Sequence, residues 1–267
     1  DAFTFYVCLE LCLVLRANKG ATAQRIDMVA TVQPSKDRSH LPVVSVLLPI
    51  CNESLVVERL IDAVSAMEYP TEQLEILVLD DSDDHTSTLA TARVAWQAAR
   101  GVPIRRLARA DKHGFKAGNL SYGVTLARGA FFAVFDADFM PSPDFLLKTI
   151  PCFQDPEVGF LQTAIGYTNR DASLLTRFQA MEMGHHQIVT EELSRSGFLG
   201  SLSGSSCVWR RACVESLGGW TAETITEDVD LGYRAQLRQW KYLYLRDVLS
   251  LSELPATMSA FRVQRDR

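Results

Sequence analysis

The sequence predicts an α/β fold with a mostly parallel central sheet, and three observations lead to this prediction. Apolar runs of strand length alternate with amphipathic stretches of helix length through the first half of the chain. Clusters of polar residues follow the apolar runs, as they do where parallel strands end. The run at 131–135 ends in Asp136 and Asp138, whose side chains would face the same way on an extended segment. Ligands of open α/β sheets bind at this edge.

Composition narrows the functional classes. The chain has 267 residues, of which 47% are hydrophobic and 22% charged, so it could form one large α/β domain or two small ones. The net charge of -5 gives no basic surface of the kind that nucleic-acid-binding proteins carry, so we expect no nucleic-acid partner. The six cysteines show no metal-binding spacing, which favours reduced thiols in a cytosolic environment.

The first residues predict contact with a membrane. Residues 2–15 form an apolar run that is too short to span a bilayer, and an excess of lysine and arginine follows it. Under the positive-inside bias, this pattern predicts the tail of a membrane helix that emerges into the cytoplasm. We therefore expect a partial transmembrane or interfacial helix at 1–16, a linker at 17–41 and a folded domain at 42–267. An ordinary buried helix is the alternative for the apolar run.

The first half of the domain is expected to alternate strand and helix. Short apolar runs predict strands at 43–48, 74–79, 102–107 and 131–135. Pro49 should stop the first strand. Amphipathic stretches predict helices at 55–67, from the acidic run at 80–84 to residue 100, and from the polar loop at 111–119 to residue 127. The acidic run would repel itself unless a cation or hydrogen-bond donors lie beside it.

The second half is less regular. We expect a short helix at 144–153, a strand at 158–162, a long helix at 173–195, a strand at 242–245 and a closing helix at 255–267. His185 and His186 lie on the long helix without an acidic partner at metal-binding spacing, so we expect structural roles for both.

A further helix is expected to begin after Thr226, a favoured N-cap residue. Its buried stripe should consist of Val229, Tyr233, Leu237 and Trp240. Glu227 and Asp228 then occupy the first turn, where the helix dipole favours anions and would keep a carboxylate ionised, as a general base requires. Ordinary capping chemistry explains the same residues.

The chain lacks both the dinucleotide-binding fingerprint and the P-loop. The diphosphate of a bound nucleotide would therefore be held by a metal and by single cations. Asp136 and Asp138 supply the hard oxygen ligands that Mg²⁺ or Mn²⁺ prefers. An Asp-rich turn closed by Pro141 and Pro143 is the alternative interpretation of this segment.

Six motifs occur in a fixed order along the chain. They are Asn52-Glu53, Asp80-Asp81, Lys116-Ala117-Gly118-Asn119, Asp136-x-Asp138, Thr226-Glu227-Asp228 and Gln264-Arg265-Asp266-Arg267. This set resembles the inverting, processive glycosyltransferases of the cellulose synthase and mannan synthase superfamily, within the family 2 glycosyltransferases. The resemblance covers about residues 43–267.

The resemblance implies a GT-A fold and a membrane-embedded enzyme with a cytosolic catalytic domain, cut short here at its C-terminal end. Such an enzyme transfers a hexose from UDP-glucose or GDP-mannose, with Mg²⁺ or Mn²⁺. The acceptor is the non-reducing end of a β-1,4-linked glucan, mannan or glucomannan, and the configuration at the sugar is inverted.

The resemblance also assigns roles to single residues. Asp228 would be the general base, and Asp136 and Asp138 the metal ligands. The nucleotide-sugar-binding residues would be Glu53, Asp80, Asp81, Lys116, Asn119, Asp136, Gln264 and Arg267. Two alternatives stay open: a degenerate nucleotide-sugar-binding partner of an active synthase, and a glycoside hydrolase, which also uses paired carboxylates.

Overall fold

A computed structural model describes residues 41–197, 199–224 and 226–265 of the chain. The helix predicted at 1–16, the linker at 17–41 except its last residue, and Arg267 lie outside the described residues. Within the described ranges, no helix is long and apolar enough to cross a membrane.

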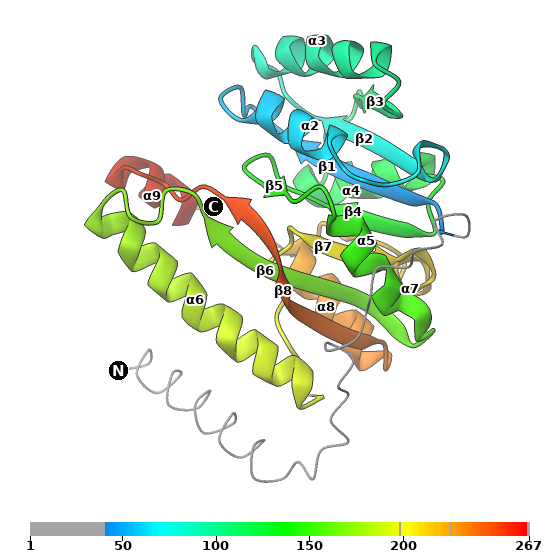
Figure 1. Cartoon of the computed structure of the whole chain (residues 1–267), viewed down its shortest axis with the longest axis vertical. Helices are drawn as coiled ribbons and strands as arrows, with labels where there is room; N and C mark the ends of the chain where they lie inside the picture. The colour runs from blue at the N-terminus through cyan, green and yellow to red at the C-terminus, as the bar shows by residue number, and fades with distance from the viewer. Residues whose placement is uncertain (1–40, 198, 225, 266–267) are drawn as a thin grey trace.

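One eight-stranded sheet organises the molecule, with the strand order β3-β2-β1-β4-β7-β6-β8-β5 (Figure 1). The strands are β1 (Val44–Ile50), β2 (Leu74–Asp80), β3 (Ile104–Leu107), β4 (Phe131–Val134), β5 (Met140–Pro141), β6 (Val158–Tyr167), β7 (Cys207–Arg210) and β8 (Lys241–Ser252). Strands β1 to β4 pair in parallel, as predicted. The sheet as a whole is mixed, because β7 runs antiparallel to both β4 and β6 and β5 runs antiparallel to β8. The second half keeps one parallel pair, β6 with β8, so the prediction of a mostly parallel sheet holds fully for the first half and in part for the second.

The strand boundaries differ from the prediction in an instructive way. Strand β1 continues through Pro49 to Ile50 rather than stopping. The last residue of β1 that pairs with β4 is Leu47, so Pro49 faces no acceptor on that side and its missing N–H costs no ladder bond. Strands β6 and β8 are also longer than predicted, because each completes the other in a parallel pair interrupted by bulges.

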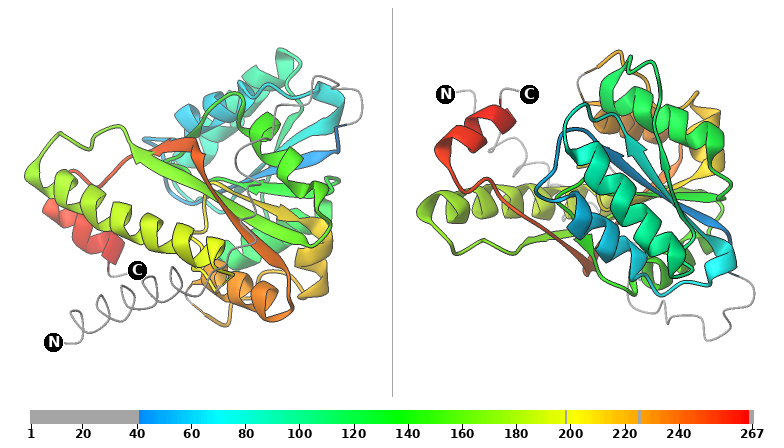
Figure 2. Two further views of the ribbon diagram at one scale, coloured as in Figure 1. Left: turned by 60° about the horizontal axis from the view of Figure 1, so that its bottom comes forward. Right: turned by 90° about the horizontal axis from the view of Figure 1, so that it is seen from above.

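Helices cover both faces of the sheet (Figures 1 and 2). One face carries α2 (Val57–Ser65), α3 (Thr86–Ala99), α5 (Phe145–Thr149) and the 3₁₀ turn η2 (Ile150–Gln154). The other carries α4 (Phe115–Leu126), α7 (Arg211–Ser216) and α8 (Glu227–Leu237). A further 3₁₀ turn, η1 (Thr71–Gln73), precedes β2.

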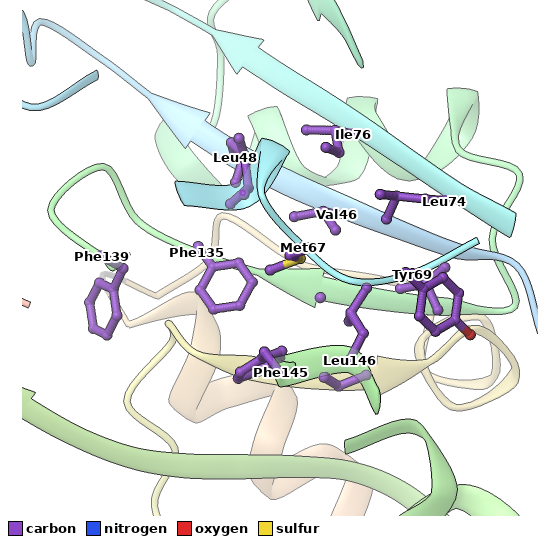
Figure 3. Packing of buried hydrophobic residues seen from close by; sticks show 14 of the residues in the cluster. Val46, Leu48, Met67, Tyr69, Leu74, Ile76, Phe135, Phe139, Phe145 and Leu146 are labelled. Carbon is purple, nitrogen blue, oxygen red and sulfur yellow. The ribbon is translucent and has the colours of Figure 1, made fainter. Parts of the chain in front are cut away.

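The sheet residues alternate between the two hydrophobic cores. Val46 and Leu48 of β1 face the α2 side, together with Ile76 of β2, whereas Leu47 and Leu77 face the α4 side. Figure 3 shows the first core, with the rings that follow β4 packed below β1 and β2. All five residues are buried, so both faces of the parallel strands are excluded from water, as the continuous apolar runs predict.

Helix α6 (Leu174–Arg195) begins where the sequence predicts. Ser173 is its N-cap: its Oγ accepts from the backbone N–H of Thr176, while the Thr176 hydroxyl accepts from the N–H of Ser173. Gln187 fastens the helix to β6, because its amide group both accepts from and donates to the backbone of Ile165. The last described helix, α9 (Met258–Arg265), lies near the start of α6 (Figure 2).

Helix α8 buries a different face from the predicted one. Leu237 of the predicted stripe is 68% exposed, whereas Glu227, Leu231 and Ala235 are buried. Gly232 also lies on the packed side of the helix, where a Cβ would make an ordinary contact of 3.6 Å with the Cβ of Leu202. The correction matters for function, because the buried face carries Glu227 into the interior.

Candidate active site

Lys116 lies at the centre of a group of carboxylates. Its ammonium is 2.6 Å from Oδ1 of Asp136 and 3.4 Å from Oε1 of Glu227, and Asp228 adds a further attraction. Burial alone would lower the pKa of Lys116, but Asp136 and Glu227 outweigh it and raise the pKa, so the lysine stays protonated. We call Lys116, Asp136, Glu227 and Asp228 the acidic cluster. One cation faces three carboxylates there.

The electrostatics of Asp228 differ from the prediction. The helix dipole was expected to keep this carboxylate ionised. Burial instead raises the pKa of Asp228 above its ordinary value, although Lys116 and the backbone N–H of Val229 pull it down. Thr226 is the N-cap residue but makes no capping hydrogen bond through its side chain. A carboxylate with a raised pKa is a stronger proton acceptor, which suits a general base.

The pKa of Glu227, the neighbouring residue, is raised in the same way, since burial outweighs the attraction of Lys116. The sequence places Glu227 in a motif but indicates no role of its own in the site. Its ion pair with Lys116 instead ties the start of α8 to the start of α4. Glu227 therefore joins the site as a group that holds Lys116.

Asp138 is positioned by a residue far away in the chain. The hydroxyl of Ser252, at the end of β8, donates to its Oδ2 at 2.6 Å. Burial raises the pKa of Asp138, and the charge of Asp136 raises it further. The backbone N–H of Asp136 donates to Oγ of Ser205, so the two aspartates are held from different elements. No local sequence pattern marks Ser252 as part of the site.

A cavity of about 540 Å³ opens beside Asp136 and Asp138. Helix α6 lines it with Gln179, Glu182 and His186, at spacings of three and four residues. His186, for which a structural role was expected, therefore faces the cavity. The repeated polar side chains on one face of α6 were the signal that could have shown this. Asp228 is not among the residues that line the cavity.

The acidic run after β2 is neutralised by the chain itself. Asp80 is buried; its oxygens accept from the backbone N–H of Ser82 at 2.8 Å and from Nε of Arg106 at 2.7 Å. Burial would raise the pKa of Asp80, but these hydrogen bonds hold it below its ordinary value. The side chain of Asp80 is 0% exposed, so it offers no accessible surface for the predicted contact with a nucleoside.

Asp81 forms a second ion pair. Arg109 contacts both of its carboxyl oxygens, with the shortest distance 2.6 Å, and each side chain is 8% exposed. The same guanidinium donates to the carbonyl oxygens of His113 and Phe115. The cations beside the acidic run are thus two arginines, Arg106 of β3 and Arg109 of the loop after it.

The residues of the motif 116–119 have different roles: Lys116 faces the site, whereas Gly118 and Asn119 serve packing. Lys116 points to the acidic cluster, whereas the buried amide of Asn119 donates to the carbonyl of Leu79 at 2.8 Å. Gly118 is needed for space, because a Cβ there would lie 2.1 Å from the carbonyl oxygen of His113. Asn119 thus anchors α4 to the end of β2, and its contact with a donor stays a prediction.

The remaining predicted residues flank this edge of the sheet. The backbone carbonyl of Glu53 accepts from the N–H groups of Val56 and Val57 at the start of α2. The preceding Asn52 joins the loops after β1 and β2 by accepting from the N–H of Asp83 at 3.0 Å. Gln264 lies on α9.

The residues present fit a divalent cation that is coordinated partly by protein carboxylates and partly by the phosphates of a bound ligand. Among the described residues, no three acidic, histidine or cysteine side chains form a metal-binding group by themselves. Asp136 and Asp138 nevertheless line one cavity, together with Glu182 and Glu253, and Asp136 already pairs with Lys116. Asp138 forms no such ion pair with any residue that the structure describes; its side-chain partner is the hydroxyl of Ser252. Mg²⁺-type sites commonly use one or two carboxylates together with substrate phosphates.

The mixed sheet and the carboxylates at its edge define a GT-A-type α/β fold. Solved structures share it: the mannosyltransferase PcManGT from Pyrobaculum calidifontis, in complex with GDP-Man and Mn²⁺, has a TM-score of 0.73 at 22% identity, over 96% of this chain and 68% of that one. S. aureus TarS 1-349 in complex with UDP-GlcNAc has a TM-score of 0.60 at 14% identity, over 82% of this chain and 60% of the other.

The chain belongs to the glycosyltransferase-like family 2, whose model matches residues 42–267. It is 39% identical over 236 residues to glucomannan 4-beta-mannosyltransferase 2 of Arabidopsis thaliana, covering 86% of the chain and 44% of the relative. It is 38% identical over 250 residues to glucomannan 4-beta-mannosyltransferase 1 of Oryza sativa subsp. japonica, covering 91% and 48%. The chain thus spans less than half the length of these relatives. Membership of this family speaks against the glycoside hydrolase alternative.

Proposed function

We propose that the protein is the catalytic part of an inverting synthase that transfers mannose from GDP-mannose to a growing β-1,4-linked mannan or glucomannan. The acidic cluster beside the cavity carries this proposal, because it places a proton acceptor and a cation next to two further carboxylates. GDP-mannose is favoured over UDP-glucose because the glucomannan mannosyltransferases are 39% and 38% identical to this chain.

Asp228 is the general base in this proposal. It takes the proton from an acceptor hydroxyl while that oxygen attacks the anomeric carbon of the donor. The bond from the anomeric carbon to the diphosphate breaks on the opposite side, so a single displacement inverts the sugar and needs no nucleophile from the enzyme. The proton ends on Asp228 and the electron pair on the diphosphate.

The leaving diphosphate is stabilised in this proposal on the cavity side, where Asp136 and Asp138 lie. Asp138, with Asp136 beside it, would hold a divalent cation, which when bound neutralises charge on the leaving group. Lys116 keeps Asp136 in place through their 2.6 Å ion pair. In the whole protein we propose a membrane anchor, with this domain on the cytoplasmic side.

The test is the substitution Asp228→Asn in the full-length protein. We expect GDP binding in the presence of Mn²⁺, measured by calorimetry, to stay within about 3-fold of wild type, because Asp228 does not line the cavity. Mannose transfer should fall by about 10²–10⁴-fold, the usual contribution of a general base. The matched control is Asp230→Asn, which removes an ion pair with Arg234 from the same helix.

This experiment distinguishes a catalytic synthase from a nucleotide-sugar-binding partner. Transfer at the wild-type rate by Asp228→Asn would contradict the assignment of the base. Nucleotide binding without transfer by the wild-type protein would favour the alternative role, a nucleotide-sugar-binding partner of another synthase.

A further inference from the structure

The turn at 203–206, just before β7, contacts two residues of the acidic cluster: Asp136 through its backbone N–H and Asp228 through its carboxylate. Oγ of Ser205 accepts from the backbone N–H of Asp136 at 2.9 Å. Gly204 lies so close to Asp228 that a Cβ on it would be 2.4 Å from Oδ2 of Asp228. The position of this one turn therefore bears on the proposed base and on the carboxylate that pairs with Lys116.

The turn adopts backbone angles that its sequence does not favour. Gly204 has φ +72°, which glycine adopts without strain. Ser206 has φ +54°, a left-handed conformation that is uncommon for serine. Ser206 is also completely buried. Surrounding contacts must hold this conformation in place.

Gln162, on β6, supplies three of the contacts that hold the turn. Its Nε2 lies 2.9 Å from the carbonyl oxygen of Ser205 and 3.2 Å from that of Ser206. Its Oε1 accepts from the backbone N–H of Ser203 at 3.3 Å. Gln162 is only 2% exposed, so one buried amide group clamps three residues of the turn.

A second set of bonds fixes the end of the turn. The hydroxyl of Thr163 lies 3.1 Å from the carbonyl oxygen of Ser206 and 2.6 Å from its hydroxyl. The Ser206 hydroxyl donates in turn to Oγ of Ser250 on β8 at 2.5 Å. All these groups are buried. The network thus joins three strands, β6, β7 and β8, beneath the acidic cluster.

We propose that Gln162 is a positioning residue for sugar transfer: by clamping the turn at 203–206, it sets the places of Asp228 and Asp136. The inference rests on the proposed function. Gln162 does not contact Asp228 itself and acts through Gly204. A misplacement of a catalytic group by about 1 Å can lower a rate by about 10²-fold.

The variant that tests this is Gln162→Met, which keeps the volume and removes every hydrogen bond of the clamp. Gln97→Met is the matched control. Gln97 is likewise a buried glutamine, 6% exposed, and its amide donates to Asp62 between α3 and α2, away from the acidic cluster. Both variants lose one buried amide, so a general loss of stability affects both.

Two measurements on the full-length protein are needed. With GDP-mannose and Mn²⁺, Gln162→Met should lower kcat by about 10²-fold with KM for GDP-mannose changed less than about 3-fold, whereas Gln97→Met leaves both near wild type. Hydrogen exchange should be faster at 203–206 and at 226–230 in Gln162→Met alone.

Equal kinetics and equal exchange in Gln162→Met and Gln97→Met would overturn the positioning role. Parallel losses of kcat and donor affinity would also overturn it, in favour of general disruption of the site. If the wild-type protein transfers no mannose, the proposed function fails, and the exchange measurement still decides whether Gln162 positions the start of α8.

Discussion

At the scale of single residues, Gly204 shows how closely the acidic cluster is packed. A Cβ on it would lie 2.4 Å from Oδ2 of Asp228, and its φ of +72° lies in the left-handed region. A side chain at this position therefore meets two obstacles: an unfavourable backbone angle and the loss of the space that Asp228 occupies.

We predict that Gly204→Ala lowers mannose transfer by about 10²-fold because it displaces Asp228. The control Gly218→Ala has a similar φ of +79° but open space around the added Cβ. It should cost only the conformational term of about 1–2 kcal/mol, seen in thermal unfolding, and leave transfer unchanged. Equal transfer rates in the two variants would show that contact with Asp228 has no catalytic effect.

The pH dependence of stability offers a second test at this scale. The pKa of Asp228 is raised in the folded protein, so the contribution of this group to stability is present below its ordinary value of 3.8 and is lost as pH rises through the folded pKa. Asparagine does not ionise, so Asp228→Asn removes this decrease in stability with rising pH. We therefore expect the inactive variant to have a higher Tm than wild type at pH 7 to 8 and a similar Tm in acid.

The control for this prediction is Asp230→Asn. Asp230 pairs with Arg234 at 2.6 Å and accepts from Thr221, so its removal should lower stability slightly or leave it unchanged. A fall in Tm for Asp228→Asn at neutral pH would contradict this prediction. It would mean that the contacts of the carboxylate stabilise the fold by more than the burial of its charge destabilises it.

At the scale of elements, the loop between β3 and α4 is held by one arginine. Arg109 pairs with Asp81 and donates to two carbonyl oxygens of the loop, and both charged side chains are 8% exposed. This interaction fixes the approach to α4, and with it the start of the helix on which Lys116 lies.

Arg109→Met should therefore destabilise the fold by about 3–5 kcal/mol, because it leaves Asp81 buried and unpaired. Denaturant unfolding measures this loss. The comparison is Arg177→Met, which breaks a pair with Asp171 whose side chains are 59% and 75% exposed and should cost at most about 1 kcal/mol. The double variant Arg109→Met/Asp81→Asn should recover part of the stability. Similar losses for both single variants would contradict the structural role of the pair.

The elements also show where prediction from sequence succeeds. Helix α6 was predicted within one residue, because Ser173 and the helical period are local signals. The buried face of α8 was predicted wrongly, since large side chains suggested one stripe, whereas the helix packs through Leu231 and Ala235 and leaves Leu237 exposed. Strands β6 and β8 were predicted too short, because their ends are stabilised by each other rather than by an apolar run of their own.

At the scale of the whole molecule, both halves of the sheet contribute residues to the site. In the parallel half, β1 to β4, strand β2 ends in Asp80, the helix after β3 carries Lys116, and the loop after β4 carries Asp136. The mixed half, β6 to β8, supplies the clamp of Gln162 and the hydroxyl of Ser252 that positions Asp138. The residues that the sequence identified lie mostly on the first half, where each polar cluster follows a recognisable strand.

The contributions of the second half could not be read from local patterns. Ser252 is 114 residues away from Asp138 along the chain, and Gln162 is 43 residues from Ser205. Only the fold brings these pairs together. The sequence motifs therefore located the charged groups, whereas the groups that position them had to come from the structure.

The most direct test of the central claim is a donor screen on the full-length protein. UDP-glucose and GDP-mannose, each radiolabelled in the sugar, are supplied with Mn²⁺ or Mg²⁺, and label is measured in polymer that β-mannanase releases. We predict incorporation from GDP-mannose that depends on the divalent cation and is lost in Asp228→Asn. Absence of transfer from both donors, while GDP still binds, would contradict the claim that this acidic cluster catalyses sugar transfer.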